Sequence, residues 1–226
     1  MGSRLAWLAF LPCLLARPAY ADGQLSVSAA LDSDDRFRGV SLSHGRPDAR
    51  LEVDYDHDSG LYGGVSLAAA SGRGQSGPLT HYTAYAGYVT RPLPGLSWDG
   101  GISHTHIDDR ERYDYDELYA GLIAGGVSAR LSYSPRYYGR DVQTLYADLS
   151  GGRQVSPHVR LFAHAGWLRR LSGSWGLRPR YDLGAGAAMT IRACELRLTV
   201  THAPPLYAWG HDDGGTALVF SAVRAF

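Results

Sequence analysis

Lysine is absent from this sequence of 226 residues, and cysteine and methionine occur only twice each. All 22 basic residues are arginines, and 22 acidic residues balance them to a formal net charge of zero. A chain without excess positive charge lacks the electrostatic footprint of a nucleic-acid-binding protein, so we expect no nucleic-acid partner.

Long apolar runs are also missing, with one exception near the start of the chain. Arg4 precedes an apolar run over residues 5–16, and Ala19-Tyr20-Ala21 provides the small residues of a cleavage site. About a dozen apolar residues are too few to cross a bilayer as a helix, which makes a retained anchor the weaker interpretation. We therefore expect residues 1–21 to be a cleaved signal peptide and residues 22–226 to form one mature domain.

The two cysteines support neither a disulfide nor a cysteine-based metal site. Cys13 lies in the expected leader, and the residues before it lack the small side chains of a lipoprotein signal. Cys194 is then the only cysteine of the mature chain, and we interpret it as a small apolar filler.

What the sequence does contain favours β-structure. It has 28 glycines and 15 tyrosines, and segments of roughly ten residues alternate apolar with polar side chains. In the clearest of them, Leu51, Val53 and Tyr55 share one face and Glu52, Asp54 and Asp56 share the other. The same alternation returns in segments that begin at Leu61, Val127, Leu145, Val159, Tyr181 and Leu196.

The connections between these segments alternate in length. Residues 56–60, 91–96, 125–126 and 192–193 form short connections, whereas residues 72–79, 107–116, 171–179 and 203–215 form longer polar ones. Short turns on one side and long loops on the other are typical of a transmembrane antiparallel up-and-down β-barrel, here of about 12 strands. Residues 25–43 fit either one long bent strand or two short ones.

The last segment supports a barrel in the bacterial outer membrane. Residues 216–226 alternate and end on Phe226, with Leu218 and Phe220 on the same face. Outer-membrane barrels finish in this way because the barrel-assembly machinery reads a terminal aromatic residue, so we expect that machinery as a partner during insertion. Arg224 interrupts the apolar face, where it can extend toward the interface.

A soluble β-sandwich is the structural alternative, since it also uses alternating strands. The second faces of these strands carry charge, serine and glycine instead of the large apolar residues that two packed sheets require. We therefore expect an all-β barrel that is polar inside and contacts lipid outside. The aromatic residues expected at the two membrane interfaces are Tyr55, Tyr82, Tyr88, Trp98, Tyr133, Trp167 and Tyr181.

The polar faces of the strands provide the candidate site. Carboxylates along a narrow aqueous passage concentrate cations, so the row Glu52, Asp54 and Asp56 is a candidate cation-attracting strip. Alternatively, inward arginines such as Arg36 and Arg38 pair with the carboxylates and cross-link the wall. The candidate pore-lining residues are Glu52, Asp54, Asp56, Arg130, Asp148, Arg160, Asp182, Glu195 and Arg197.

Several blocks of the sequence resemble the TorF-like porin family of proteobacteria. The blocks are residues 34–41 followed by Pro47, residues 59–65, 116–119 and 133–139, Tyr146, and residues 163–166. The resemblance implies a signal-bearing outer-membrane barrel, and it departs from the family pattern at Asp35 and Leu61. The matching motif residues are Arg36, Phe37, Arg38, Gly39, Ser41, Pro47, Gly60, Tyr62 and Gly64.

Catalytic and metal chemistry have weaker support. His104 and His106, followed by Asp108 and Asp109, have a spacing that can hold a metal only if a third ligand approaches, and His211 is better explained as part of a polar turn. Ser103 and His104 are adjacent and point to opposite faces of a strand, which argues against a nucleophile–base pair. His164 with Ser150 stays open as a combination. We expect no catalytic residue, metal or cofactor.

The sequence thus predicts passive diffusion of small hydrophilic solutes through an outer-membrane barrel. A non-conducting surface protein and, less favoured, a lipid-acting enzyme are the alternatives. The identity of the solute, the oligomeric state, and whether a loop such as residues 171–179 folds into the lumen are left open.

Overall fold

The structure, a computed structural model, describes residues 23–70, 79–108, 112–173, 177–204 and 215–226. The expected leader therefore lies outside the described residues. The strands are β1 Gly23–Asp32, β2 Arg36–Phe37, β3 Val40–Ser41, β4 Asp48–His57, β5 Leu61–Ala70, β6 Leu79–Leu93, β7 Leu96–Asp108, β8 Arg112–Ala124, β9 Val127–Ser134, β10 Val142–Ser156, β11 Val159–Gly173, β12 Arg180–Ile191, β13 Cys194–Ala203 and β14 Gly215–Ala225, with one short 3₁₀ helix, η1 Tyr137–Gly139.

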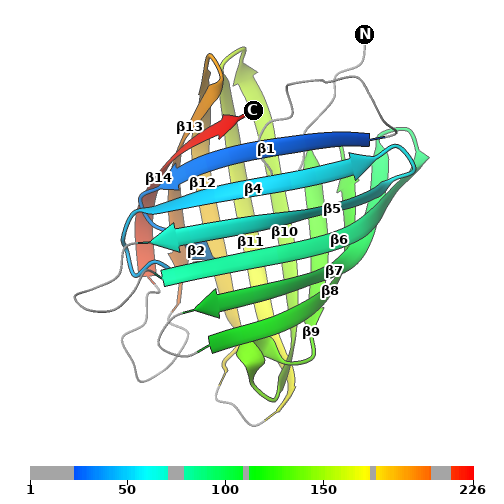
Figure 1. The fold of residues 1–226 in the computed structure, drawn as a ribbon, viewed down its shortest axis with the longest axis vertical. Helices are drawn as coiled ribbons and strands as arrows, with labels where there is room; N and C mark the ends of the chain where they lie inside the picture. The colour runs from blue at the N-terminus through cyan, green and yellow to red at the C-terminus, as the bar shows by residue number, and fades with distance from the viewer. Residues whose placement is uncertain (1–22, 71–78, 109–111, 174–176, 205–214) are drawn as a thin grey trace.

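All strands except β2 and β3 form one closed antiparallel barrel of twelve strands, as predicted. Each barrel strand pairs with its neighbours in the sequence, and β1 closes the ring on β14 from Ser28↔Ala225 to Asp32↔Ser221 (Figure 1). The tilted front strands cross the back strands β10–β14 in this view, as expected for a closed barrel. Among the described residues, no helix is long and apolar enough to cross a bilayer.

The outer face of the barrel is apolar. Leu218 is 63% exposed although it lies in the middle of a paired strand, and the outward positions of the other strands are similar. Exposed leucines on every side of a closed sheet are stable only when lipid is the outer solvent, so the β-sandwich alternative is wrong. Six of the seven predicted interface aromatics are exposed: Tyr55, Tyr82, Tyr88, Trp98, Trp167 and Tyr181.

The two ends of the barrel differ, and we call them the turn end and the loop end. The connections 58–60, 94–95, 125–126, 157–158 and 192–193 lie with Gly23 and Ala225 at the turn end. The opposite strand ends lie at the loop end, together with the described connections 33–47 and 135–141. These strand ends are Asp32, Asp48, Ala70, Leu79, Asp108, Arg112, Ser134, Val142, Gly173, Arg180, Ala203 and Gly215. The predicted connection 107–116 is wrong in extent, because β7 continues to Asp108 and β8 begins at Arg112.

A small hairpin occupies the lumen at the loop end. After β1 ends at Asp32, the chain forms the two-stranded sheet β2–β3, which is separate from the barrel sheet. Neither predicted arrangement of residues 25–43 describes this segment. The apolar core lies inside the barrel at the same end and comprises Ile107, Tyr115, Tyr137, Tyr138, Val142, Tyr146, Leu168 and Leu177, with Phe37 and Leu42 packed against it.

Candidate functional site

We call residues 34–45 the lumen hairpin. Its two strands are connected by a two-residue turn. Arg38 and Gly39 connect β2 to β3, with φ angles of 50° and 76°. Positive φ at both central residues is the geometry of a type I′ hairpin turn, in which glycine is favoured. A Cβ at Gly39 would lie 2.4 Å from the Cβ of Ala203 and 3.0 Å from that of Asp182, so the turn also touches the barrel wall closely.

Asp34 stabilises the lumen hairpin through hydrogen bonds to other residues of the hairpin. Its carboxylate accepts hydrogen bonds from Arg36 Nε at 2.5 Å, from Ser43 Oγ at 3.0 Å and from the hydroxyl of Ser41. Arg36 also donates to the carbonyl of Gly39 at 2.9 Å. The charged and hydroxylated residues of the motif therefore fold the hairpin on itself.

Arg38 fixes the lumen hairpin to the barrel wall. Its Nη2 donates to both carboxylate oxygens of Glu117 on β8, at 2.9 and 2.8 Å. The guanidinium also lies over the rings of Tyr146, at 4.0 Å, and Phe37, at 4.7 Å. Cation–π contacts and a charge-assisted pair strengthen each other where water is excluded.

Tyrosines surround this ion pair. Tyr115 packs on Phe37 of the hairpin, with ring centroids 6.4 Å apart, and on Tyr137 and Tyr138 of η1, at 5.4 and 5.3 Å. Burial raises the pKa of the Tyr137 and Tyr138 hydroxyls, so both remain neutral hydrogen-bonding groups at physiological pH. Tyr138 has a φ of 52°, a conformation that the packed surroundings maintain.

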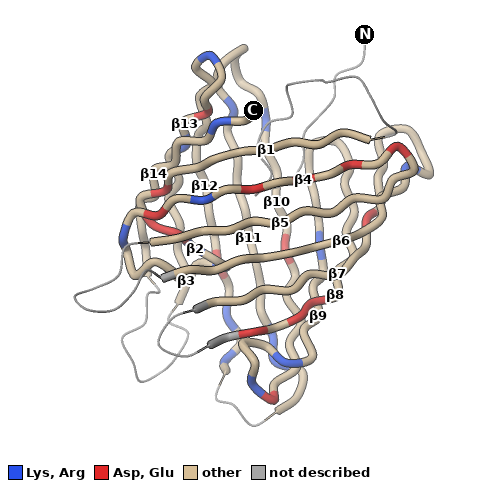
Figure 2. The backbone as a smooth tube through the Cα atoms, viewed as in Figure 1, with Lys and Arg blue, Asp and Glu red and all other residues tan. Residues whose placement is uncertain are grey.

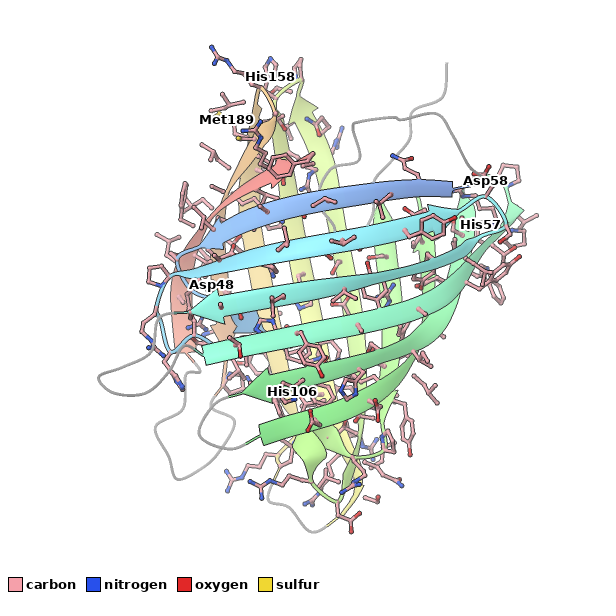
Figure 3. All side chains as sticks on the ribbon, viewed as in Figure 1. Asp48, His57, Asp58, His106, His158 and Met189 are labelled. Atoms are coloured by element: carbon pink, nitrogen blue, oxygen red, sulfur yellow. The ribbon has the colours of Figure 1, made fainter. Side chains whose placement is uncertain are left out.

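Other contacts extend across the mouth of the barrel. Asp35 of the hairpin faces His81 of β6, with Oδ2 and Nδ1 3.1 Å apart. Asp48, which Figure 3 places at the loop end of β4, lines a small pocket with Asp35, Ser43 and His81. The lumen hairpin thus touches β6, β8, β10, β12 and β13 and narrows the lumen at the loop end.

A second polar cluster lies nearer the turn end. Tyr62 donates to Asp99 at 3.1 Å and to the Tyr119 hydroxyl at 2.9 Å. Arg130 pairs with Asp99 at 2.6 Å, and its guanidinium lies 4.6 Å from the ring centre of Tyr119. Tyr62 and Arg130, two residues that the sequence singled out, therefore meet through Asp99. Of the other motif residues, Gly60 lies in the β4–β5 turn and Gly64 on the inner face of β5.

The three carboxylates of the acidic row on β4 differ in how deeply they are buried. Glu52 and Asp54 are buried in the barrel interior, whereas Asp56 is exposed near the turn end. The Tyr85 hydroxyl donates to Asp54. Figure 2 shows acidic positions spaced along β4.

The remaining predicted lumen charges form pairs. Glu195 accepts from Arg160 at 3.4 Å and from the Arg197 Nε, all three on β11 and β13 near the turn end. The alternative that inward arginines pair with inward carboxylates therefore describes this part of the wall.

The structure brings Ser150, His164 and Asp182 together on β10, β11 and β12. Ser150 Oγ lies 3.1 Å from His164 Nδ1, and His164 Nε2 lies 2.5 Å from Asp182. However, Nδ1 also faces Asp148 at 2.7 Å, so a carboxylate stands against each ring nitrogen. A general base needs a free lone pair toward its nucleophile, and this ring is held by two acceptors instead. We interpret His164 as a bridge between two carboxylates.

His104 and His106 face outward, away from the lumen. His104 Nδ1 contacts Asp116 at 2.8 Å, and His106, labelled on β7 in Figure 3, contacts Asp114. Both cross-strand partners lie on β8, and Asp109 lies outside the described residues. No group of three or more His, Cys, Asp or Glu within the described part of the chain is placed to hold a metal ion. His211 lies outside the described residues.

Sequence reasoning missed the main contact of the site, Arg38–Glu117. Both residues belong to blocks that carry the family resemblance, yet nothing in the sequence pairs them. It also missed Arg180, a buried inward arginine at the start of β12. For Arg38 the available signal was a charged residue next to Gly39 within the motif block 34–41. No comparable signal marks Arg180.

Comparisons with known proteins agree with this architecture. A family model described as "Bacterial protein of unknown function (Gcw_chp)" matches residues 18–204. No curated protein matches the sequence. The structure is similar to the KdgM porin, with a TM-score of 0.59 and 13% identity over 89% of this chain and 99% of that chain.

Two further solved structures are similar. The KdgM porin in complex with disordered oligogalacturonate gives a TM-score of 0.56 at 13% identity, over 89% of this chain and 99% of that one. The COG4313 outer membrane channel from Pseudomonas putida F1 gives 0.50 at 13% identity, over 92% and 97%. At these identities the likeness establishes the fold, that of outer-membrane barrels. Together with the apolar outer face, it places the protein in the bacterial outer membrane.

Proposed function

We propose that this chain, which belongs to the Gcw_chp family of bacterial proteins of unknown function, is an outer-membrane channel for the passive diffusion of small hydrophilic solutes. One observation carries the proposal: a closed barrel that is apolar outside has an interior of charged and hydroxylated side chains. Polar interiors in membrane barrels serve water and hydrated solutes.

Two comparisons support the channel rather than another use of the barrel. The KdgM porin and the COG4313 channel share the fold over almost all of their length. The resemblance of residues 34–41 and 59–65 to the TorF-like porins points the same way. These residues form the lumen hairpin and a tyrosine position inside the barrel, where a solute would pass.

In this proposal the lumen hairpin sets the size of the passage. Arg38, Phe37 and Gly39 reach across to β8, β10, β12 and β13 at the loop end, which orients toward the cell exterior in barrels of this kind. Asp182 lies at this constriction, where Gly39 packs against it. The other candidate pore-lining residues are Glu52, Asp54, Asp56, Arg130, Asp148, Arg160, Glu195 and Arg197.

The same hairpin favours a second candidate, a non-conducting surface barrel. A loop segment anchored by a buried ion pair can close a lumen as well as narrow it. For an enzyme, the only assembled constellation in the described residues is the His164 bridge, whose ring nitrogens both face carboxylates.

Liposome swelling tests the proposal. Purified protein, refolded into phospholipid vesicles loaded with an impermeant dextran, is diluted into isotonic solutions of glycerol, arabinose and a trisaccharide. A narrow channel lets small solutes pass faster than large ones, so vesicles should swell fastest with glycerol and slowest with the trisaccharide. Swelling no faster than protein-free vesicles with every solute, by protein shown to be folded by circular dichroism, favours the non-conducting barrel.

A further inference from the structure

Arg180 is a buried cation that has no counter-ion among the residues that the structure describes. It is the first residue of β12, faces the lumen and is only 4% exposed. Its Nε and Nη2 are buried and have no hydrogen-bond partner within the described ranges of the chain. An arginine has five donors in a fixed fork and cannot lose its charge, so the arrangement leaves a strong donor set unused.

Asp182, the acidic residue that follows Arg180 on the inner face of β12, already has hydrogen-bond partners. Asp182 accepts from the Tyr146 hydroxyl at 3.1 Å and from His164 at 2.5 Å. Among the other buried carboxylates at this end, Glu117 is bound by Arg38, Asp34 by Arg36 and Asp32 by Arg50, and Asp35 faces His81. Asp48 lies beside Asp35 and His81 in the small pocket under β4 and β6. No described carboxylate pairs with Arg180.

Arg180 lies close to the lumen hairpin and its aromatic surroundings. Arg180 pairs with Leu168 of β11, and Leu168 pairs with Tyr146 of β10, so these three buried side chains share one row across the barrel wall. The guanidinium of Arg38 lies over the ring of Tyr146 at 4.0 Å. Gly39, the neighbour of Arg38, packs against Asp182, two residues beyond Arg180. The two arginines therefore belong to one region of the loop-end mouth.

Further donors in this region lack partners. Nη1 of Arg38 is buried and unsatisfied, as are the hydroxyls of Tyr115, Ser134 and Thr144. Ser134 and Thr144 are opposite each other on β9 and β10. Most buried polar groups in proteins are hydrogen-bonded, so buried donors without partners indicate a ligand that supplies acceptors.

We propose that Arg180, together with Arg38, forms a binding site for the oxyanion group of a solute, a carboxylate or a phosphate, at the loop-end mouth of the lumen. Two guanidiniums in one region of the mouth repel each other, and an oxyanion between them would relieve that repulsion and pair with both forks. The tyrosine and threonine hydroxyls would supply further donors. This inference rests on the proposed channel function, because it names the chemical class of solute that the mouth selects.

Calorimetric titration of the refolded protein in an uncharged detergent tests the site directly. The probes are inorganic phosphate and succinate, each against sodium chloride of the same ionic strength. We expect saturable binding of at least one probe, and the two titrations distinguish a phosphate from a carboxylate preference. Arg180→Met should weaken that binding at least about tenfold, because it removes the charge-assisted hydrogen bonds of the guanidinium. Arg180→Lys, which keeps the charge without the fork, should weaken it less.

Arg153→Met is the matched control, since Arg153 is an exposed arginine on β10, and it should bind as the unchanged protein does. In the absence of either probe, Arg180→Met should have an unfolding midpoint equal to or above that of the unchanged protein, because it removes an uncompensated buried charge. Absence of saturable binding, equal binding by Arg180→Met, or failure of Arg180→Met to fold would each overturn the site. Binding is measured without flux, so a barrel that binds but does not conduct refutes only the channel.

Discussion

Arg38 and Glu117 are 79 residues apart in the sequence, yet one guanidinium nitrogen of Arg38 donates to both carboxylate oxygens of Glu117 inside the barrel. The pair joins the lumen hairpin to the wall at β8. Both side chains are buried, so neither charge has water to replace its partner. Breaking a buried pair on one side is costly, and the hairpin position should therefore depend on it.

Breaking the Arg38–Glu117 ion pair should widen the passage through the lumen. Arg38→Ala leaves Glu117 buried without a counter-charge, a cost of about 3–5 kcal/mol that undocking of the hairpin relieves. We expect faster swelling of vesicles that contain the variant, with the largest gain for the trisaccharide. The double variant Arg38→Met, Glu117→Met replaces the pair by apolar side chains and should keep the rate of the unchanged protein. Equal rates for all three proteins would remove the hairpin from the permeation path.

Gly39 should be intolerant of a side chain. Alanine there would meet Ala203 at 2.4 Å and would also adopt a φ of 76°. Overpacking costs about 1–3 kcal/mol, in addition to about 1 kcal/mol of backbone strain. Gly45 has a similar φ of 69° and open space around it, so Gly45→Ala isolates the strain alone. In limited proteolysis of folded protein, we expect cleavage within residues 33–47 to be faster for Gly39→Ala than for Gly45→Ala. The reverse order would contradict the close contact.

The acidic row of β4 should favour cations. Replacement of Glu52, Asp54 and Asp56 by their amides should shift the reversal potential in a potassium chloride gradient toward zero, because fewer fixed charges then concentrate cations in the lumen. Asp114→Asn with Asp116→Asn neutralises two carboxylates on the outer face and serves as the control. A reversal potential that the β4 variant leaves unchanged would exclude this row from the pore.

The His164 bridge should be structural. His164→Gln leaves Asp148 and Asp182 without their shared donor and should lower the unfolding free energy by about 1–3 kcal/mol. Ser150→Ala removes a hydroxyl that bonds weakly to the same group and should change it by less than about 1 kcal/mol. Neither the unchanged protein nor either variant should hydrolyse a p-nitrophenyl ester above the buffer rate. Ester hydrolysis that depends on Ser150 would instead establish a catalytic triad.

The sequence predicts the barrel well because its signal is local. Leu51, Val53 and Tyr55 alternate with three carboxylates, and in a strand this period of two fixes which face is apolar. The strand count and the two different ends follow from the same signal. Where strands extend beyond the lipid, as at His106 and Asp114, outward residues turn polar, so the ends of β7 and β8 could not be located.

The site was less predictable because it depends on contacts across the barrel. Strands of two residues, such as β2 and β3, have no periodicity, so the lumen hairpin left no pattern in the sequence beyond the Arg38-Gly39 pair, in which glycine suits a tight turn. Arg130 and Arg180 are both inward arginines on strands whose side chains alternate between apolar and polar. Only the folded barrel shows that Arg130 has Asp99 as a partner and that Arg180 has no carboxylate partner in the described part of the chain.

Single-channel recording in a planar lipid bilayer is the most direct test of the central claim, that water and small solutes pass through the interior of this barrel. In 1 M potassium chloride, refolded protein should insert with discrete current steps, and Arg38→Ala should give larger steps than the unchanged protein. Folded protein that inserts without current steps, both unchanged and as Arg38→Ala, would contradict the account.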